Sequence, residues 1–350
     1  MIRNNSIDRT AKSLFIVAFI VVAFYFFGSV LMPILFSGIA SLILLPMVKF
    51  FERIKMGKAF SVFLTVFLIL ILLSGLILVL VVQSQSIVTE LPKLMKENES
   101  FLNVDPENIT LNSFSNMIGI EVETLKNYIS SLKGGLITVI EGGYKGVTNF
   151  VVFLITCPIY IFFMLMYRNN VYKFITEAQR KRDNGKDSDQ IIDDVKHSLF
   201  QYLKGMLLVM LTVGVLTYLG LLLLGIKYAL FLGILTALLT PLPYIGVIIS
   251  ATIPVIIAVL TKDSIWYSAG VLGVFAVVQF LEGNVITPKI MGNNVNLNPL
   301  IIIISLVIFG AIAGVLGLIL TVPLLAVIKV IIEHSPNLKQ WKYLFEDKKS

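Results

Sequence analysis

The chain has 350 residues, of which 57% are hydrophobic and only 14% are charged. A soluble interior of this size cannot enclose so much apolar surface, and the patches left outside would aggregate. The net charge of +7 does not indicate a nucleic-acid partner, because the basic residues lie between the apolar runs, where they orient membrane helices. Composition therefore excludes a soluble domain and predicts an integral membrane protein.

Apolar runs long enough to cross a bilayer recur along the chain. About 20 helical residues cross the roughly 30 Å hydrocarbon core. We expect six full transmembrane helices, near residues 13–32, 33–48, 59–83, 147–167, 205–224 and 265–281. Two longer stretches, 229–261 and 298–332, have helix breakers near their middles. The predicted fold is thus all-α, with two broken or re-entrant helical hairpins and about eight membrane segments altogether.

The N-terminal runs are predicted to form a helical hairpin. The first run follows Arg3, Arg9 and Lys12, as a secretory signal would, but it is longer than the apolar region of about 7–15 residues found in signals. We expect it to be retained as a membrane helix. A second run follows at once and ends in basic residues, so we expect a tight turn near Pro33 between two antiparallel spans.

Basic residues predict the orientation. They precede the first span, cluster in the linker 168–204 and recur in the tail, whereas the segment 84–146 is acidic on balance. Since cytoplasmic loops carry the excess of Lys and Arg, both termini are predicted in the cytoplasm. The resulting organisation is as follows: N-terminal membrane helices at 1–83, an extracytoplasmic segment at 84–146, a fourth membrane helix at 147–167, a cytoplasmic linker at 168–204, a C-terminal transport core at 205–332 and a cytoplasmic tail at 333–350.

The two segments outside the spans show helical periodicity. In the extracytoplasmic segment, apolar residues recur at steps of three and four from Ile118 to Val139, which is typical of an amphipathic helix. It would pack on the protein or the lipid interface, or form a subunit contact. The linker 168–204 is predicted to form two short amphipathic helices on the cytoplasmic surface, before the next span begins.

The breakers in the two long stretches point to a transport pathway. Unpaired backbone groups cost several kcal/mol each in hydrocarbon unless protein, water or substrate satisfies them. Paired Gly/Pro-interrupted apolar segments are therefore typical of a transporter's binding site. A plain hairpin turn and close helix packing are the structural alternatives. The candidate pathway residues in the first stretch are Pro241, Pro243 and Tyr244, and the candidate hinge or gate residues are Gly246, Gly310, Gly314, Gly317 and Pro323.

A polar run lies between the two long stretches. Glu282 is the only carboxylate between Asp263 and Glu333. Ionisable residues near a membrane interior are costly, so they are functional candidates; the alternative is a carboxylate at the water interface beside Asn-rich turns. The candidate substrate or ion residues of this run are Gln279, Glu282, Asn284, Pro288 and Asn296.

These residues resemble a known family. The run Gln279…Glu282-Gly-Asn…Pro288…Gly292…Leu297-Asn-Pro299, then Gly310…Gly314…Gly317 and Pro323, together with Pro243-Tyr-Ile-Gly246, is similar to the AI-2E family of transporters. The resemblance implies export of the small polar signal autoinducer-2, sodium (or lithium)/proton antiport in some members, and a homo-oligomer. The sequence departs from the family at Gly205-Met206, where Gly-Gln is frequent.

No constellation for enzyme chemistry is present in the sequence. His197 and His334 are the only histidines and are far apart, Cys157 is the single cysteine, and no nucleotide-binding phosphate loop or nucleophile elbow occurs. We expect no metal, no cofactor and no enzymatic activity.

Three functions remain open at this point. We expect a secondary exporter of a small polar solute in the cytoplasmic membrane of a bacterium, with the lipid bilayer, the solute and H+ or Na+ as partners. The second is a sodium (lithium)/proton antiporter, although no acidic group lies well inside a span. The third is a membrane scaffold without transport, for which the broken helices have no purpose.

Overall fold

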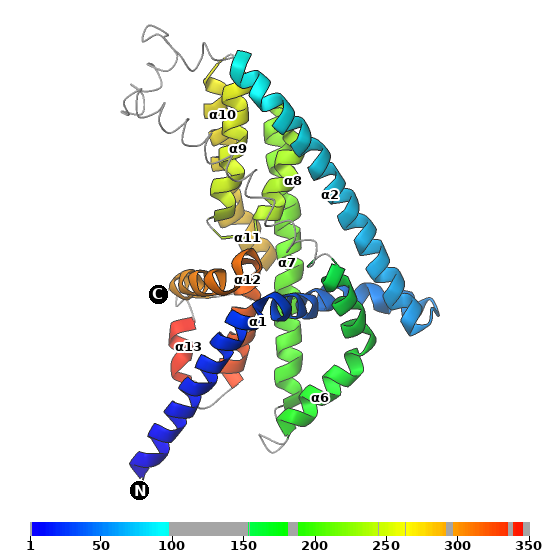
Figure 1. Cartoon of the computed structure of the whole chain (residues 1–350), viewed down its shortest axis with the longest axis vertical. Coiled ribbons are helices and arrows are strands. Elements are labelled where there is room, and N and C mark those ends of the chain that lie inside the picture. The colour runs from blue at the N-terminus through cyan, green and yellow to red at the C-terminus, as the bar shows by residue number, and fades with distance from the viewer. Residues whose placement is uncertain are drawn as a thin grey trace. The chain divides into compact units, whose positions relative to one another are not determined.

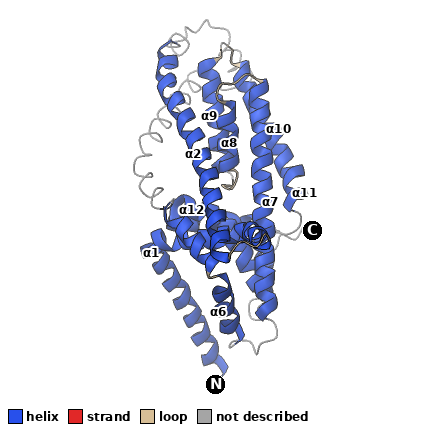
Figure 2. Ribbon diagram, turned by 90° about the vertical axis from the view of Figure 1, so that its right-hand side faces the viewer, coloured by secondary structure: helices blue, strands red, loops and turns tan. Residues whose placement is uncertain are grey.

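The computed structural model describes residues 2–97, 153, 155–180, 188–243, 245–262, 264–291, 297–334 and 339–345. Across these residues all regular elements are helices (Figures 1 and 2). They are α1 (Ile2–Arg53), α2 (Lys58–Glu97), α6 (Arg168–Arg180), α7 (Ser188–Leu223), α8 (Ala229–Leu239), α9 (Ile245–Thr261), α10 (Trp266–Leu281), the π-helix η1 (Glu282–Ile286), α11 (Thr287–Met291), α12 (Pro299–His334) and α13 (Lys339–Phe345). A further short apolar helix covers Ile155–Met166.

Five helical stretches among the described residues are long and apolar enough to cross a membrane. They are Val30–Arg53, Lys58–Ile87, Ile192–Leu223, Trp266–Met291 and Pro299–His334. The prediction of an all-α integral membrane protein is confirmed, and the predicted spans 59–83, 205–224 and 265–281 each coincide with part of one of these stretches to within one residue. The orientation of the termini and the predicted division into functional segments stay predictions.

The predicted hairpin turn near Pro33 is wrong. α1 is helical from Ile2 to Arg53, with Pro33 and Pro46 inside it. A proline removes one backbone hydrogen bond and kinks a helix, but it does not by itself reverse the chain. The carbonyl oxygen of Pro33 accepts a hydrogen bond from Cys157 Sγ, and Ser37 Oγ donates to the Cys157 carbonyl at 3.2 Å. These contacts with the helix Ile155–Met166 hold α1 in place at the proline.

A single helix runs through the predicted boundary between linker and membrane span at residue 204. α6 matches the first predicted amphipathic helix, but the second is the beginning of α7, which continues to Leu223 without interruption. The reason is that no proline or polar turn separates the two predicted segments. The amphipathic helix predicted at Ile118–Val139 lies outside the described residues, although α2 continues into the predicted extracytoplasmic segment as far as Glu97.

The chain divides into two compact units. The first comprises Met1–Leu68, Phe153–Lys204 and Asn293–Ser350, and the second comprises Ile69–Val152 and Gly205–Gly292. The first unit therefore contains α1, α6, α12 and α13, whereas the second contains α8, α9, α10, η1 and α11.

Two ion pairs join charged helix ends within the first unit. Arg168, at the start of α6, binds both carboxylate oxygens of Glu52, near the end of α1, at 2.7 and 2.8 Å. His334 Nε2, at the end of α12, lies 3.1 Å from Asp194 Oδ2 near the start of α7. Each pair joins helix ends that are far apart in the sequence but belong to the first unit.

Close backbone contact holds the second unit together. A Cβ added at Gly233 of α8 would lie 2.8 Å from the carbonyl oxygen of Gly214 in α7, and one at Gly214 would lie 3.0 Å from the carbonyl oxygen of Gly233. Only glycine permits helices to approach this closely, as in membrane helix pairs generally. An apolar core that includes Leu221, Leu232 and Val271 surrounds this contact line.

Both long apolar stretches reverse direction. α8 and α9 pack against each other, and a Cβ added at Gly246 would run into the carbonyl oxygen of Leu239 across the turn. The breaks predicted from Pro241 and Pro243 are thus confirmed. With 11 residues, α8 measures about 16 Å, which is too short to cross the roughly 30 Å core alone.

The second reversal lies inside α12. Gly314 has φ 58° and ψ −138°, a combination essentially restricted to glycine. A Cβ added at Gly317 would collide with the carbonyl oxygen of Phe309, eight residues earlier, and one at Gly310 would lie 2.8 Å from Leu318 Cδ2. In a straight helix, residues eight apart are separated by about 12 Å. The stretch 299–334 is therefore a helical hairpin.

Alanine at Gly317 should distinguish a hairpin from a straight helix. We expect Gly317→Ala to lower the thermal unfolding midpoint of the detergent-solubilised protein, because the new Cβ overpacks the turn, at a cost of about 1–3 kcal/mol. Gly273→Ala in α10, where a Cβ would meet nothing within 4 Å, is the matched control and should be neutral or slightly stabilising. Equal midpoints for the two variants would contradict the hairpin.

Candidate functional site

A π-helix interrupts the last part of the span that begins at Trp266. α10 ends at Leu281, η1 covers Glu282–Ile286, and α11 follows directly. The proline at 288 explains the change of register, because a proline in an α-helix has no N–H to donate and its ring crowds the carbonyl four residues earlier. Widening the preceding turn relieves this conflict. Single π turns within helices occur frequently at functional sites.

Glu282 opens the π-helix and is the centre of a small polar cluster. Its Oε2 accepts a hydrogen bond from the side-chain amide of Gln279, and Thr287 Oγ1 donates to Oε1 at 3.4 Å. Glu282 and Thr287 are half-buried and Gln279 is exposed. Two of the predicted residues are therefore brought together, and Thr287 is a third member that sequence reasoning did not single out.

Asn284 and Pro288 flank this cluster without joining it. The Asn284 amide donates to the carbonyl oxygen of Phe280 at 2.9 Å, within its own helix. Pro288 is exposed on α11. Tyr244 and Asn296, both predicted for the pathway, lie outside the described residues.

The cluster and the first hairpin turn lie at the same end of the second unit. α9 and α10 pack together and are joined by the short connection 262–265, with Ile257 and Ala258 in one apolar cluster with Val271. The two helices have 17 and 16 residues, about 25 Å each, so they run side by side over the same distance (Figure 1). The end of α10, where Glu282 follows, therefore lies level with the turn that carries Pro241 and Pro243.

α7 packs against the segment formed by η1 and α11. A Cβ added at Gly205 would lie 3.1 Å from Met291 Cγ, so α11 rests directly on the α7 backbone. Ile286, Ile290 and Met291 pack against a buried cluster that contains Val209 of α7. The π-helix and α11 are thus packed on an apolar surface that α7 contributes to.

The second hairpin belongs to the other unit. Gly310 and Gly314 form its turn, and Gly317 and Pro323 lie buried in its returning arm. Its base is closed by an apolar cluster that contains Leu297, Leu325 and Phe345. Gly246, Gly310 and Gly314 therefore lie at chain reversals, one in each unit, whereas Pro323 lies within a hairpin arm; the hinge or gate role of these residues stays a prediction.

Cys157 and His334, considered above as possible reactive or metal-binding residues, have structural partners. Cys157 is buried and bonded to α1, and His334 pairs with Asp194. Over the described part of the chain, no group of three or more His, Cys, Asp or Glu residues could hold a metal ion. The glycine contact between Gly214 and Gly233 escaped sequence analysis, because glycines nineteen residues apart on different helices share no local pattern.

The arrangement combines a half-buried carboxylate, two hydrogen-bond donors and a proline-containing turn at one end of an apolar helix bundle. A carboxylate with such neighbours can accept hydrogen bonds from a polar solute, or exchange a proton or cation. Interrupted helices near a polar site are the usual construction of secondary transporters. Fold and site together define a multi-pass membrane transporter.

Comparison with known proteins specifies the family. The family described as AI-2E family transporter matches residues 14–337, and the chain belongs to it. A provisionally named transport protein, YueF of Bacillus subtilis (strain 168), is 27% identical over 87% of this chain and 84% of its own length. The provisionally named permease PerM of Escherichia coli (strain K12) is 26% identical over 89% of each chain. YrrI of Bacillus subtilis (strain 168), also provisionally named a transport protein, is 33% identical over 56% of this chain and 55% of its own length.

Water access to the cluster can be measured with introduced thiols. In a Cys157→Ala background, which lacks cysteine, we expect Glu282→Cys to react with a membrane-impermeant maleimide at least about tenfold faster than Phe280→Cys, because the reactive thiolate forms only in water. Phe280 is 63% exposed on the same helix and serves as the matched control for a lipid-facing position. Equal rates at the two positions would show that Glu282 does not line an aqueous path.

Proposed function

We propose that this protein is a secondary exporter of a small polar solute. The observation that carries the proposal is the Gln279–Glu282–Thr287 cluster on a π-helix, level with the reversal of a helical hairpin in a membrane bundle. A purely structural element has little reason to keep a carboxylate and broken backbone there, since each costs free energy in a membrane.

In this mechanism Glu282 and its neighbours bind the solute. The Glu282 carboxylate accepts hydrogen bonds from solute hydroxyl groups, and Gln279, exposed on the same face, supplies a donor and an acceptor. Backbone carbonyls in the turn that carries Pro241 and Pro243 offer further acceptor lone pairs at the same end of the unit. Such a site suits a hydroxylated molecule better than an apolar one, because apolar solutes would leave these groups unpaired.

The two hairpins act as gates in the proposed cycle. Each reverses within a few residues at glycine or proline, so small changes of φ and ψ at the turn move a whole arm. Each compact unit contributes one gate, at 240–246 and at 310–317. Alternating exposure of the site then requires movement of short hairpin arms rather than unfolding of a span.

The family supports the more specific part of the proposal. We infer autoinducer-2 or a similar small polar compound as the solute, the bacterial cytoplasmic membrane as the location and a homo-oligomer as the working form. The relatives with matching sequences are bacterial and named for transport or permeation.

Cation/proton antiport is the second candidate function. The observation that favours it is the Glu282 carboxylate itself, with each oxygen already accepting a hydrogen bond. That geometry can exchange a proton for a cation without a large rearrangement of the site. A change in cation tolerance without any change in exported solutes would place this function first.

Efflux from cells is the direct test. We expect overproduction of the wild-type protein to raise one small polar compound in the medium, identified by untargeted metabolite profiling. Glu282→Gln keeps the side-chain shape but removes the charge. It should reduce that efflux about tenfold or more, because loss of a hydrogen bond to a charged group typically weakens binding by that factor. Glu177→Gln, at an exposed position on α6, removes the same charge elsewhere and should leave efflux unchanged. Unaltered efflux in Glu282→Gln, at equal amounts of membrane protein, would refute the role of this site.

Proton coupling has its own signature. If inward proton movement through Glu282 drives export, wild-type efflux should fall as the medium is made more alkaline, because the inward proton gradient shrinks. The residual efflux of Glu282→Gln should then be insensitive to external pH. A variant whose pH profile parallels that of the wild-type protein would remove Glu282 from proton coupling, although it could still bind solute.

A further inference from the structure

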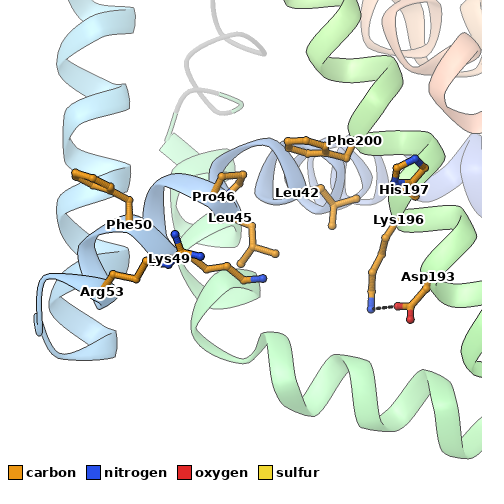
Figure 3. A pocket seen from close by; sticks show the side chains of 10 residues that line it. All are labelled: Leu42, Leu45, Pro46, Lys49, Phe50, Arg53, Asp193, Lys196, His197 and Phe200. Atoms are coloured by element: carbon orange, nitrogen blue, oxygen red, sulfur yellow. Dashed lines mark hydrogen bonds and ion pairs between the residues drawn. The ribbon is translucent and has the colours of Figure 1, made fainter.

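The first unit contains a cavity that shares no lining residue with the candidate transport site. It has a volume of about 630 Å³ and is enclosed by the last part of α1 and the first part of α7 (Figure 3). None of the predicted pathway or gate residues lines it. Its walls carry the basic residues Lys49, Arg53 and Lys196, the polar residues Asp193 and His197, and the apolar residues Leu42, Leu45, Pro46, Phe50 and Phe200.

The cavity carries excess positive charge. Lys196 forms an ion pair with Asp193 at 3.2 Å and lies 3.7 Å above the Tyr172 ring, so its position is fixed. On the opposite wall, Lys49 and Arg53 have no carboxylate within ion-pair distance among the described residues. Three cations against one carboxylate leave two positive charges in excess.

The two unpaired cations share one helix face. Lys49 and Arg53 are four residues apart on α1, so they project from the same side of the helix; Figure 3 shows them on the wall facing Lys196 and Asp193. Both side chains are exposed. A phosphate group placed between them would gain charge-assisted hydrogen bonds, with the guanidinium able to bind two of its oxygens.

The remaining lining is apolar and suits hydrocarbon. Five of the ten lining residues are apolar, and Phe50 is 59% exposed beside the cations. A free inorganic anion would gain nothing from these side chains, whereas an amphiphile would cover them and so remove apolar surface from water. The lining therefore favours a molecule with an anionic head and an apolar tail.

The charged residues of the cavity lie at the ends of two candidate membrane spans. Lys49 and Arg53 are at the end of the candidate span Val30–Arg53, and Asp193 and Lys196 are at the start of the candidate span Ile192–Leu223. Basic residues at helix ends meet the headgroup layer, and basic pockets between membrane helices on the cytoplasmic side bind anionic headgroups.

We propose that this cavity is a binding site for an anionic phospholipid. The phosphodiester lies between Lys49 and Arg53, Lys196 closes the opposite side, and the acyl chains follow the apolar faces that begin at Leu45 and Phe200. The lipid would bridge α1 and α7, so it would stabilise the first unit independently of any transported solute.

Lipid titration of the full-length protein in detergent tests this site. We expect phosphatidylglycerol, but not phosphatidylcholine with the same acyl chains, to raise the thermal unfolding midpoint and to appear as a bound adduct in native mass spectrometry. Lys49→Gln/Arg53→Gln should weaken phosphatidylglycerol binding about thirtyfold, as expected for the loss of two basic contacts. Lys173→Gln/Lys204→Gln removes the same charge from exposed positions outside the cavity and should bind as the wild-type protein does.

Three outcomes would overturn the proposal. One is equal phosphatidylglycerol binding by the cavity variant and the wild-type protein. Another is an equal loss in both double variants, which would indicate a general charge effect. The third is stabilisation by inorganic phosphate alone that depends on Lys49 and Arg53, which would indicate a free-anion site. If the double variant does not fold, the single variant Lys49→Gln, at an exposed position, provides the same comparison.

Discussion

Backbone hydrogen bonding is the constraint on which this structure depends. Hydrocarbon supplies neither donors nor acceptors, so each membrane segment must satisfy its own N–H and C=O groups. Long uninterrupted helices such as α7, with 36 residues, are the simple solution. Within the described residues the chain departs from it at the turn between α8 and α9, at the reversal at Gly314 and at the π-helix that begins at Glu282. Each departure leaves backbone groups without helical partners. The polar residues of the apolar C-terminal half concentrate near two of these places, and for this reason the candidate site lies there.

The same constraint explains which parts of the fold could be predicted from the sequence. Hydropathy identified the membrane class and several spans, because the requirement for about 20 apolar residues applies to each span independently. The reversals at Pro241 and Gly314 were also predictable, since each stretch was too long for one crossing and contained breakers. The prediction at Pro33 was wrong because the sequence around a proline does not distinguish a kinked helix from a turn. Whether the chain bends or reverses there depends on tertiary contacts, here those of Cys157 and Ser37, which no local pattern encodes.

The candidate site was predicted less completely than the fold. Composition drew attention to Glu282 because it is an isolated carboxylate among apolar residues. Its pairing with Gln279 follows from helical spacing, but the contribution of Thr287 depends on the π-helix, which shifts the register by one residue. The cavity between α1 and α7 could not have been predicted at all, since Lys49 and Lys196 are 147 residues apart in sequence. Their proximity is a product of packing within the first unit.

The division into two units has a consequence for biosynthesis. The segment Gly205–Gly292 is contiguous, and its helices pack against sequence neighbours, so its contact order is low and its closure is fast. The first unit combines Met1–Leu68, Phe153–Lys204 and Asn293–Ser350, and so it cannot be completed until the ribosome has delivered the last of these segments. Helix α1, which packs on α12, is therefore synthesised well before its partner. During that interval the face of α1 that later packs on α12 is without that partner, and exposed apolar surface of this kind is what insertases and membrane chaperones protect.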